Sequence, residues 1–293
     1  MAQIKAVIFD LDGTVCNTLQ DLAECTNRAL ADYGLPGHTV EAYKKIVGNG
    51  VDTQMRRAIG EEKYTKELAD KVKAAFKSYY DQDYLKNTKP YEGMPQALDE
   101  LKAMGLKIAV FSNKPDEFAG KVCTALFGDR FDLVAGNRPG IPVKPDPAGL
   151  FLALEKLDVT PEECVYCGDS CVDMDTGKNA GILTVGVEWG FRDRKELEEH
   201  DACYILQSPS QLPDLLRRLM NQTSRLEPAS PAPAFFRWRQ PTRSKIYPNG
   251  TSPTSRSFLT PSRNSRTGIW NACPLFAGRR GHRWFRFTPS PPT

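Results

Sequence analysis

The chain has 293 residues, of which 40% are hydrophobic and 26% are charged. This composition excludes a chain that is disordered throughout, and the length allows one large domain or two small ones. The formal net charge of +3 conceals an asymmetry, because residues 221–293 hold twelve of the 39 Lys and Arg but only one of the 36 Asp and Glu. Residues 1–220 are therefore acidic, and the remainder is strongly basic.

The first residues give no sign of export. The apolar run at residues 6–9 stops at Asp10, which is too short for a signal peptide. No stretch reaches the roughly 18 apolar residues that a membrane span requires. Eight cysteines occur at spacings that fit no disulfide framework. We therefore expect a cytoplasmic protein with free thiols and no membrane association.

The hydrophobic pattern predicts a strand at 4–9, then helices over 18–33 and 40–83. From residue 90 onward strands and helices alternate. This is typical of right-handed βαβ units and of a parallel sheet covered on both faces. The predicted elements are a helix from Pro95 to Met104, a strand at 106–111, a helix at 116–126, a strand at 131–135, a helix at 147–157, a strand at 164–167, a helix at 172–180, strands at 182–187 and 202–206, and a helix at 209–220.

The helical stretch near the start is too long for a simple connection between two strands. We therefore predict an α/β fold with a Rossmann-like parallel-sheet core over 1–14 and 89–220, and an inserted all-helical domain over 15–88. Residues 221–293 contain eleven of the 22 prolines and no apolar periodicity. Such a segment cannot bury enough surface to offset the entropy of ordering it, so we expect a disordered basic tail rich in Pro and Arg.

A folded element is the least favoured interpretation of the tail, and two other interpretations stand beside it. Arginine alternates with aromatic residues at 235–239 and 283–287, a pattern found in proteins that bind single-stranded nucleic acid. The preference for Arg over Lys and the near absence of acids differ sharply from the rest of the chain. We favour an out-of-frame or read-through extension beginning near residue 221, so nucleic-acid binding is the less favoured interpretation.

Polar side chains follow three of the predicted strands, and a lysine lies in a loop between later elements. In an open α/β sheet the carboxyl ends of the strands form the crevice in which ligands bind. We therefore expect these groups to surround one site. They are Asp10, Asp12, Gly13 and Thr14 after the first strand, Ser112, Asn113 and Lys114 after the strand at 106–111, Lys144, and Asp169 and Asp173 after the strand at 164–167.

The residue types indicate phosphoryl chemistry. Carboxylates such as Asp10 and Asp169 can hold Mg²⁺ together with a substrate phosphate. A carboxylate can also act as a nucleophile and form an aspartyl-phosphate. Asp12, two residues further on, could protonate the leaving oxygen and then activate a water molecule.

The neighbouring residues suit the binding of a phosphate. Gly13 permits a sharp turn that brings backbone N–H groups close to the ligand. Ser112 can donate a hydrogen bond to a phosphoryl oxygen, and Lys144 can offset the negative charge that gathers there. Gly13 belongs to the predicted substrate-binding set, which is completed by Thr14, Asn113 and Lys114.

Each segment alone has an ordinary structural explanation. Asp and Gly are common in turns after strands, and Asp173 could simply favour the N-terminus of a helix. Cys164, Cys167 and Cys171 suggest a zinc site, but a structural site needs four ligands, and two residues three apart on a strand point to opposite faces. We therefore expect these cysteines to pack in the core.

Taken together and in chain order, the segments resemble the four motifs of the haloacid dehalogenase superfamily over residues 1–220. The motifs are Asp10-Leu-Asp12-Gly13-Thr14, Ser112-Asn113-Lys114, Lys144-Pro145 and Gly168-Asp169-Ser170-x-x-Asp173. The resemblance implies that Asp10 is the nucleophile and Asp12 the general acid and base. It implies that Ser112 and Lys144 contact the phosphoryl group and that residues 15–88 form a cap over the site. It also implies Mg²⁺ held by Asp10, the Asp12 backbone carbonyl and Asp169, with Asp173 in support.

Within the superfamily the chain resembles the phosphoglycolate phosphatase branch most closely. Residues 91–93, 176–181 and 189–192 carry this likeness, and Asp12 stands where the dehalogenases lack an aspartate. The branch often has Asp-Ser where Asn17-Thr18 occur here. The resemblance implies Mg²⁺-dependent hydrolysis of a small phosphorylated metabolite, with 2-phosphoglycolate as the best candidate, by a monomer or homodimer.

Other functions fit parts of the same pattern. A phosphosugar mutase of the same fold would use the same four motifs. A pyrophosphatase or nucleotidase would differ only in substrate. A nucleic-acid-binding protein that acts through the basic tail is the alternative from another class.

Overall fold

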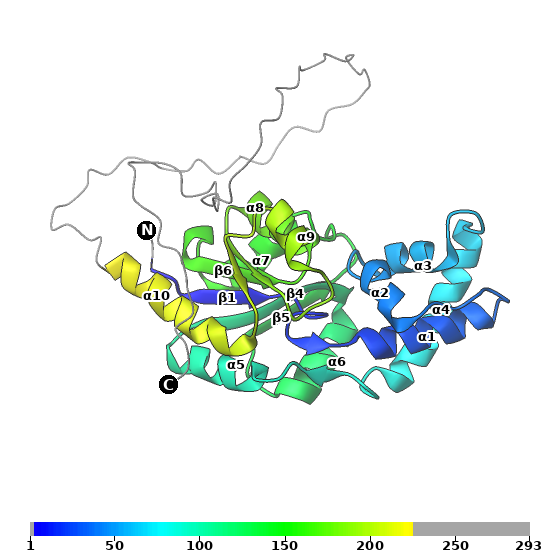
Figure 1. Ribbon diagram of the computed structural model, residues 1–293, viewed down its shortest axis with the longest axis horizontal. Coiled ribbons are helices and arrows are strands. Elements are labelled where there is room, and N and C mark those ends of the chain that lie inside the picture. Colours follow the sequence, from blue (N-terminus) through cyan, green and yellow to red (C-terminus); the bar gives the residue numbers. More distant parts are fainter. Residues whose placement is uncertain (1–2, 225–293) are drawn as a thin grey trace, which may run out of the picture. The chain divides into compact units, whose positions relative to one another are not determined.

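The computed structural model describes residues 3–224 (Figure 1). The tail predicted for 221–293 lies outside this range except for residues 221–224, which continue the last helix, α10 (Leu212–Ser224). No helix within residues 3–224 is long and apolar enough to cross a membrane.

The predicted α/β fold is confirmed. Six parallel strands form one sheet in the order β5-β4-β1-β6-β7-β8, with β1 between β4 and β6. The strand order therefore reverses beside β1, which in open sheets creates a crevice at the carboxyl ends of the strands. The strands are β1 (Ala6–Phe9), β4 (Lys107–Pro115), β5 (Leu133–Asn137), β6 (Cys164–Gly168), β7 (Leu183–Val187) and β8 (Tyr204–Leu206).

Helices cover both faces of this sheet, and its central strands are therefore buried on both sides. Side chains of α5, α6 and α10 form one hydrophobic cluster with the sheet, and side chains of α7 and α8 take part in another. Cys167 belongs to the first cluster and Cys164 to the second, so these two cysteines point to opposite faces. The remaining bounds are α5 (Met94–Ala103), α6 (Asp116–Phe127), α7 (Ala148–Leu157), α8 (Cys171–Ala180) and α9 (Arg194–Glu199), with short 3-10 helices at Pro161–Glu163 and Pro209–Gln211.

Four helices follow the first strand before the sheet resumes. Their buried side chains form a hydrophobic cluster of their own, which Phe118 and Phe191 join from the rest of the chain. The two connections to this helical block pair with each other as short antiparallel strands, β2 (Cys16–Asn17) and β3 (Lys89–Pro90). The helices are α1 (Leu19–Ala31), α2 (Val40–Ile46), α3 (Val51–Ile59) and α4 (Lys66–Asp83).

One predicted boundary was wrong in a way that matters for the site. The strand expected to end at Phe111 continues to Pro115, so Ser112, Asn113 and Lys114 lie within β4 rather than after it. The side chains of these polar residues form hydrogen bonds with neighbouring segments of the chain, as described below. The sequence pattern also missed β2, β3 and α9, which are too short to show a period.

Candidate active site

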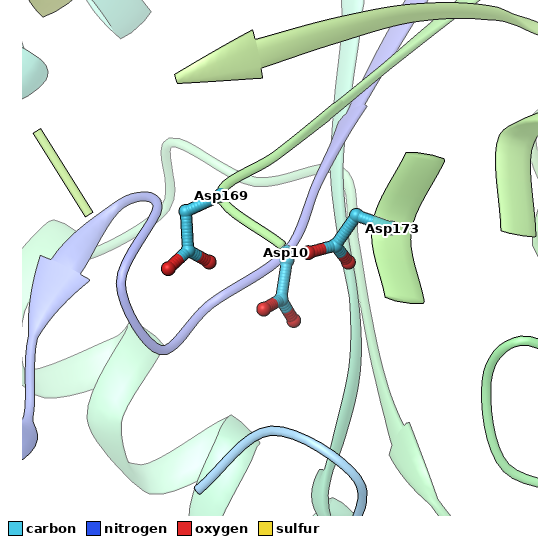
Figure 2. A group of neighbouring side chains, drawn as sticks. All are labelled: Asp10, Asp169 and Asp173. Atoms are coloured by element: carbon cyan, nitrogen blue, oxygen red, sulfur yellow. The ribbon is translucent and has the colours of Figure 1, made fainter. Parts of the chain in front are cut away.

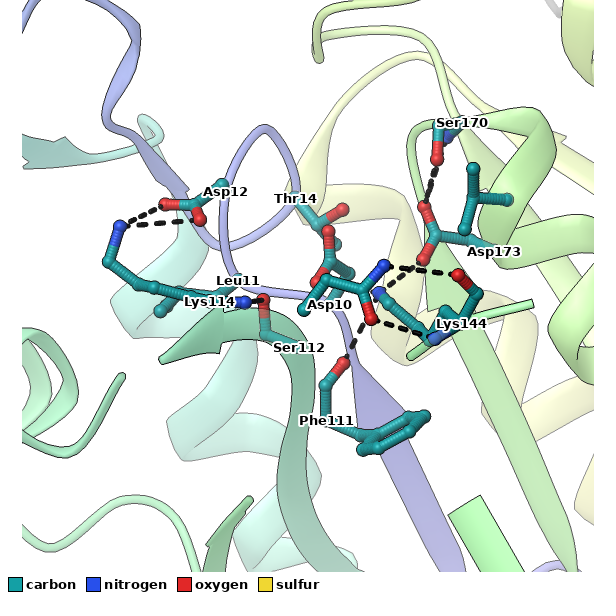
Figure 3. A network of polar contacts seen from close by, with 12 residues as sticks. Asp10, Leu11, Asp12, Thr14, Phe111, Ser112, Lys114, Lys144, Ser170 and Asp173 are labelled. Atoms are coloured by element: carbon teal, nitrogen blue, oxygen red, sulfur yellow. Dashed lines mark hydrogen bonds and ion pairs between the residues drawn. The ribbon is translucent and has the colours of Figure 1, made fainter. Parts of the chain in front are cut away.

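A lysine between two carboxylates forms the centre of the site (Figure 3). Asp10 follows β1 directly, and its Oδ1 lies 2.8 Å from Nζ of Lys144. The same Nζ donates to Oδ1 of Asp173 at 2.7 Å. Lys144 is only 2% exposed, so these charges interact in a poorly screened environment. The ammonium group therefore fixes the two carboxylates relative to each other.

Asp173 has bonded neighbours on both carboxylate oxygens. Its Oδ1 also accepts a hydrogen bond from the Tyr166 hydroxyl at 3.0 Å. Its Oδ2 accepts from the backbone N–H and the hydroxyl of Ser170, at 3.2 and 2.6 Å, which forms a capping box at the start of α8. Asp173 is thus tied to a helix N-terminus and to a core strand at once, and it holds Lys144 in place.

Asp169 is held by the loops on either side of it. Its carboxylate accepts from the Thr14 hydroxyl at 3.2 Å and from the Phe191 backbone N–H at 2.7 Å. Gly13 passes close by with φ +92°, and a Cβ at that position would collide with the Asp169 carboxylate. Glycine is therefore required there for both its conformation and its size. Trp189 secures the same turn by donating from Nε1 to the Thr14 carbonyl at 2.9 Å.

Burial and neighbouring carboxylates raise the pKa values of Asp10 and Asp169. Burial, partly offset by Lys144 and reinforced by Asp173, raises the pKa of Asp10 to about 6. Burial together with the charges of Asp173 and Asp10 raises the pKa of Asp169 to about 8. Burial opposes the charge on Lys144, but Asp10 and Asp173 outweigh it and keep the pKa of the ammonium well above its ordinary value. The cluster therefore carries more carboxylates than its one lysine can neutralise.

This excess of negative charge fits a cation. Asp10, Asp169 and Asp173 each offer an oxygen atom, and these three atoms lie within 4.8 Å of one another (Figure 2). Carboxylate oxygen is the donor that hard divalent cations prefer. A bound cation would relieve the repulsion that raises the pKa values of Asp10 and Asp169. The three residues could therefore hold a metal ion.

Asp12 is held by a different lysine. Lys114 Nζ donates to both of its carboxylate oxygens, at 3.0 and 3.3 Å, and the Thr18 hydroxyl donates to Oδ1 at 2.7 Å. Lys114 is buried, and its ammonium lies 4.8 Å from the centre of the Tyr80 ring. Asp10 and Asp12 thus have separate ionic partners, so their carboxylates can serve different purposes.

A pocket opens in front of Asp10 and Asp12, between the sheet and the helical block. The floor combines charged and polar groups of the sheet, whereas the opposite wall is mostly apolar. The first side is formed by Asp10 and Asp12 after β1, by Ser112, Asn113, Lys114 and Pro115 of β4 and by Phe118 of α6. The helical block contributes Leu22, Val47, Gly48, Gly50, Val51, Gln54, Phe76 and Tyr80. The arrangement allows a reacting group at Asp10 and a leaving group beneath the helices.

Two side chains join the rim of the pocket to the loop between α2 and α3. Asn113 donates from Nδ2 to the Gly48 carbonyl at 3.2 Å, and Arg192 donates to the Val47 carbonyl at 3.0 Å. Asn113 also brackets the backbone of Lys144, accepting from its N–H at 2.8 Å and donating to its carbonyl at 3.2 Å. Asn113 therefore links the position of the loop to the position of the buried lysine.

The structure brings all the predicted site residues into this region, but in three groups. Asp10, Lys144 and Asp173 form the ionic centre, while Gly13 and Thr14 pack against Asp169. Lys114 bonds Asp12, and Ser112 lines the pocket with its Oγ accepting from the Lys114 N–H at 3.3 Å. The sequence predicted that these residues would lie near one another, but it did not predict which side chains would contact each other.

Sequence reasoning missed three side chains of the site. Tyr166 bonds Asp173 and Lys144 from β6, and its hydroxyl in an otherwise apolar buried strand was a detectable signal. Thr18 bonds Asp12 from the residue before α1, at the position where the phosphoglycolate phosphatase branch often has Ser. Tyr80 lines the pocket from α4, where no motif marks it.

The chain is similar in sequence to known proteins. The sequence pattern of haloacid dehalogenase-like hydrolases matches residues 7–187. A phosphoglycolate phosphatase of Pseudomonas putida is 32% identical over 221 residues, which cover 74% of this chain and 78% of the relative. A phosphoglycolate phosphatase of Aquifex aeolicus is 30% identical over 214 residues, which cover 73% of this chain and 97% of the relative.

Solved structures agree with the sequence comparison. The crystal structure of a candidate phosphoglycolate phosphatase from Lactobacillus delbrueckii subsp. bulgaricus superposes with a TM-score of 0.70 at 31% identity. The superposition covers 73% of this chain and 99% of that one. The likeness therefore spans the sheet, its helices and the helical block.

Proposed function

The chain belongs to the haloacid dehalogenase-like hydrolases, and from this premise we propose that it is a Mg²⁺-dependent phosphatase acting on a small phosphomonoester. One observation carries the proposal. Asp10 faces a pocket beside a buried lysine and two further carboxylates, while Asp12 is held by a different lysine. This is the charge arrangement that phosphoryl transfer through a carboxylate needs.

The reaction runs in two steps on residues of the turn after β1. Asp10 attacks phosphorus, so that its oxygen forms a bond to phosphorus while the ester P–O bond breaks. The leaving alkoxide takes a proton from Asp12. In the second step a water oxygen forms a bond to phosphorus while the bond between phosphorus and the Asp10 oxygen breaks, and the water gives a proton to Asp12. This step releases inorganic phosphate and restores both carboxyl groups.

The surrounding residues prepare these steps. Lys144, 2.8 Å from Asp10, favours the ionised nucleophile and faces the negative charge of the incoming phosphoryl group. The Ser112 hydroxyl and the backbone of Gly13 and Thr14 bind phosphoryl oxygens, with Asn113 and Lys114 completing the substrate-binding set. Asn113 acts by fixing Lys144, and Lys114 by holding Asp12.

The carboxylate cluster fits Mg²⁺ as the cofactor. We assign Asp10, the Asp12 backbone carbonyl and Asp169 as its ligands, supported by Asp173. When bound, the ion would act as a Lewis acid that neutralises charge on the phosphoryl oxygens. Asp173 is the least available ligand, because hydrogen bonds from Lys144, Tyr166 and Ser170 already occupy both of its oxygens.

We propose that residues 15–88 act as a cap domain on a core formed by 1–14 and 89–220. The helical block has its own hydrophobic cluster and supplies one wall of the pocket, which supports this division. Its contacts with Asn113 and Arg192 involve backbone carbonyls alone, so they can break and re-form without leaving a buried charge unpaired. Closure of such a cap excludes water from the reacting centre.

The preferred substrate is 2-phosphoglycolate. Relatives at 30–32% identity carry the name phosphoglycolate phosphatase, and their likeness extends over both the core and the helical block. The pocket lining also includes a cation, Lys114, whose positive charge favours an anionic substrate.

Phosphate release by the purified full chain tests the proposal. The substrates are 2-phosphoglycolate, a phosphosugar, a nucleoside monophosphate and pyrophosphate, each with added Mg²⁺ and with EDTA. We expect Mg²⁺-dependent release that is fastest with 2-phosphoglycolate. Faster release from another compound would keep the chemistry and reassign the substrate. Isomerisation of the phosphosugar without phosphate release, or no reaction with any compound, would overturn the proposal.

A further inference from the structure

Residues 189–192, between β7 and α9, pack directly on the carboxylate cluster. Gly190 passes so close to Asp169 that a Cβ on it would collide with the Asp169 side chain and with the Gly13 carbonyl. The next residue, Phe191, donates its backbone N–H to Asp169 Oδ2 at 2.7 Å. The position of this segment therefore depends on the position of one carboxylate, and the proposed reaction steps use none of its four residues.

Phe191 connects this carboxylate to the helical block. Its side chain is buried in the hydrophobic cluster of α1 to α4, although its backbone belongs to the segment that packs on Asp169. One residue thus contacts Asp169 through its N–H and the helices through its ring. Because these two groups are covalently joined, a shift of the Asp169 carboxylate changes the position of a ring on which the helices pack.

Arg192 extends the connection to the loop between α2 and α3. Its guanidinium group donates to the Val47 carbonyl at 3.0 Å, and its Nε lies 3.3 Å from Oε1 of Glu196. The same Glu196 oxygen accepts from the backbone N–H of Cys171 at 3.0 Å, two residues after Asp169. The Arg192 side chain is only 12% exposed, so its hydrogen bond to Val47 is worth more than one on the open surface.

The loop that Arg192 bonds is part of the pocket wall. Val47 and Gly48 both line the pocket, so a bond to the Val47 carbonyl sets the position of this wall. Glu196 belongs to α9, on the same side of the pocket as Arg192. The guanidinium group therefore keeps an ionic partner when the Val47 carbonyl moves away. The contact with the loop can form and break without leaving the charge of Arg192 unpaired.

We propose that Arg192 is a positioning residue, which holds the loop between α2 and α3 over the pocket when a divalent cation fixes Asp169. This inference rests on the proposed Mg²⁺-dependent function and extends it from the reacting atoms to the closure of the pocket. With the Asp169 carboxylate held in one orientation, Gly190 and Phe191 are fixed against it, and Arg192 is in place to bond Val47. The cation thereby shifts the loop toward its closed position.

The test measures backbone hydrogen exchange over residues 46–51, with Mg²⁺ and with EDTA, in the full-length wild type, Arg192→Met and the control Arg130→Met. Arg130 also pairs with a carboxylate, that of Asp99 at 2.7 and 3.1 Å, but it does not line the pocket. We expect Mg²⁺ to slow exchange by about tenfold in the wild type and in Arg130→Met, as the loss of one hydrogen bond to a charged group implies. In Arg192→Met this protection should disappear.

Titration calorimetry with Mg²⁺ shows whether the cation still binds. Arg192→Met keeps all the proposed ligands, so it should bind Mg²⁺ with an affinity at most about tenfold weaker, because the coupling between cation and loop is reciprocal. The thermal midpoint in EDTA should stay close to that of the wild type. If Arg192→Met does not fold, Arg192→Lys replaces it, since an ammonium group can pair with Glu196 but lacks the fork that bonds Val47 at the same time.

Two results would overturn the role of Arg192 and leave the phosphatase function in place. One is a Mg²⁺-dependent protection of residues 46–51 that is equal in the folded Arg192 variant and in the wild type. The other is a wild type that binds Mg²⁺ without any such protection. A wild type that binds no Mg²⁺ would instead refute the Mg²⁺-dependent function itself.

Discussion

The two sides of the pocket consist of different types of side chain. On the sheet side Asp10, Lys144 and Asp173 form a buried ionic cluster in which the lysine contacts both acids. On the helical side Phe76 and Tyr80 stack on each other in a wall that is mostly apolar. In the proposed function, the sheet side stabilises charge at the reacting centre, whereas the helical side accommodates the leaving group.

The two sides should therefore respond differently to substitution. Removal of one partner from a buried ion pair leaves an uncompensated charge and costs about 3–5 kcal/mol. Volume-conserving changes in an apolar wall usually cost less than about 1.5 kcal/mol. Reaction chemistry is thus difficult to alter here without loss of stability, while substrate preference can change through the helical wall.

The largest effect is expected from Asp10→Ala. Loss of the nucleophile should lower kcat by about 10⁴-fold or more. The protein should stay folded and melt close to the wild type, because Asp173 remains as the ionic partner of Lys144 and burial disfavours the ionised Asp10 carboxylate. Phosphate release and thermal unfolding measure the two effects, with the exposed Asp129→Asn as a control. Near-wild-type activity of the Asp10→Ala protein would refute the mechanism.

Lys144→Met should affect both activity and stability. The substitution keeps the volume but leaves Asp10 and Asp173 without their shared cation. We expect the free energy of unfolding in urea at neutral pH to fall by about 3–5 kcal/mol, together with a large loss of kcat. The exposed Lys156→Met should change neither. A Lys144→Met protein as stable as the wild type would show that the cluster does not depend on this lysine.

Asp21→Ala tests the junction between the two sides. Asp21, in the first turn of α1, accepts hydrogen bonds from the backbone and side chains of Asn87 and Thr88, at 2.7 to 3.0 Å. It therefore ties the entry of the helical block to its exit. Loss of these bonds should lower the free energy of unfolding by about 1–3 kcal/mol in urea denaturation. Asp32→Ala, on the exposed end of the same helix, serves as the control, and an equal effect there would contradict a special role for Asp21.

A further prediction is a pH dependence of stability that Mg²⁺ should reverse. Without metal, the folded protein keeps protons on Asp10 up to about pH 6 and on Asp169 up to about pH 8, whereas the unfolded chain loses them near 3.8. The folded state binds more protons in this window, so its stability falls as the pH rises. The thermal midpoint in EDTA should therefore decline through these values, and the gain on adding Mg²⁺ should increase with pH.

Asp169→Asn provides the control for this measurement. The variant has no titrating group at the position with the higher pKa, so its decline should end near the lower value, about pH 6. A Mg²⁺ effect that is the same at all pH values would argue against a metal site made of these carboxylates.

The sequence predicted the charged side of the pocket much better than the apolar side. Asp10, Asp12 and Asp169 each follow a buried strand within a short contiguous motif, so their convergence follows from the parallel sheet. Tyr80 lies far from any motif, and its place in the pocket depends on how four helices pack. Side chains positioned by helix packing leave no local pattern in the sequence.

The end of β4 shows a second limit. Ser112, Asn113 and Lys114 suggest a turn by composition, and the predicted strand therefore stopped at Phe111. The structure continues the strand, which pairs with β5 again at Pro115, while the side chain of Asn113 bonds the backbone of Lys144 and Gly48 and that of Lys114 bonds Asp12. These partners come from distant segments, so local propensity could not reveal them. The same partners are part of the proposed site.

The most direct test of the account is a search for a phosphoryl group on Asp10. Full-length Asp12→Asn is mixed with 4-nitrophenyl phosphate and Mg²⁺, because nitrophenolate leaves without a proton while the water step still needs a base. We predict a burst of nitrophenolate equal to the enzyme concentration, and an acid-quenched peptide that carries one phosphoryl group on Asp10. Absence of both the burst and the adduct, or an adduct on another residue, would contradict nucleophilic catalysis by Asp10.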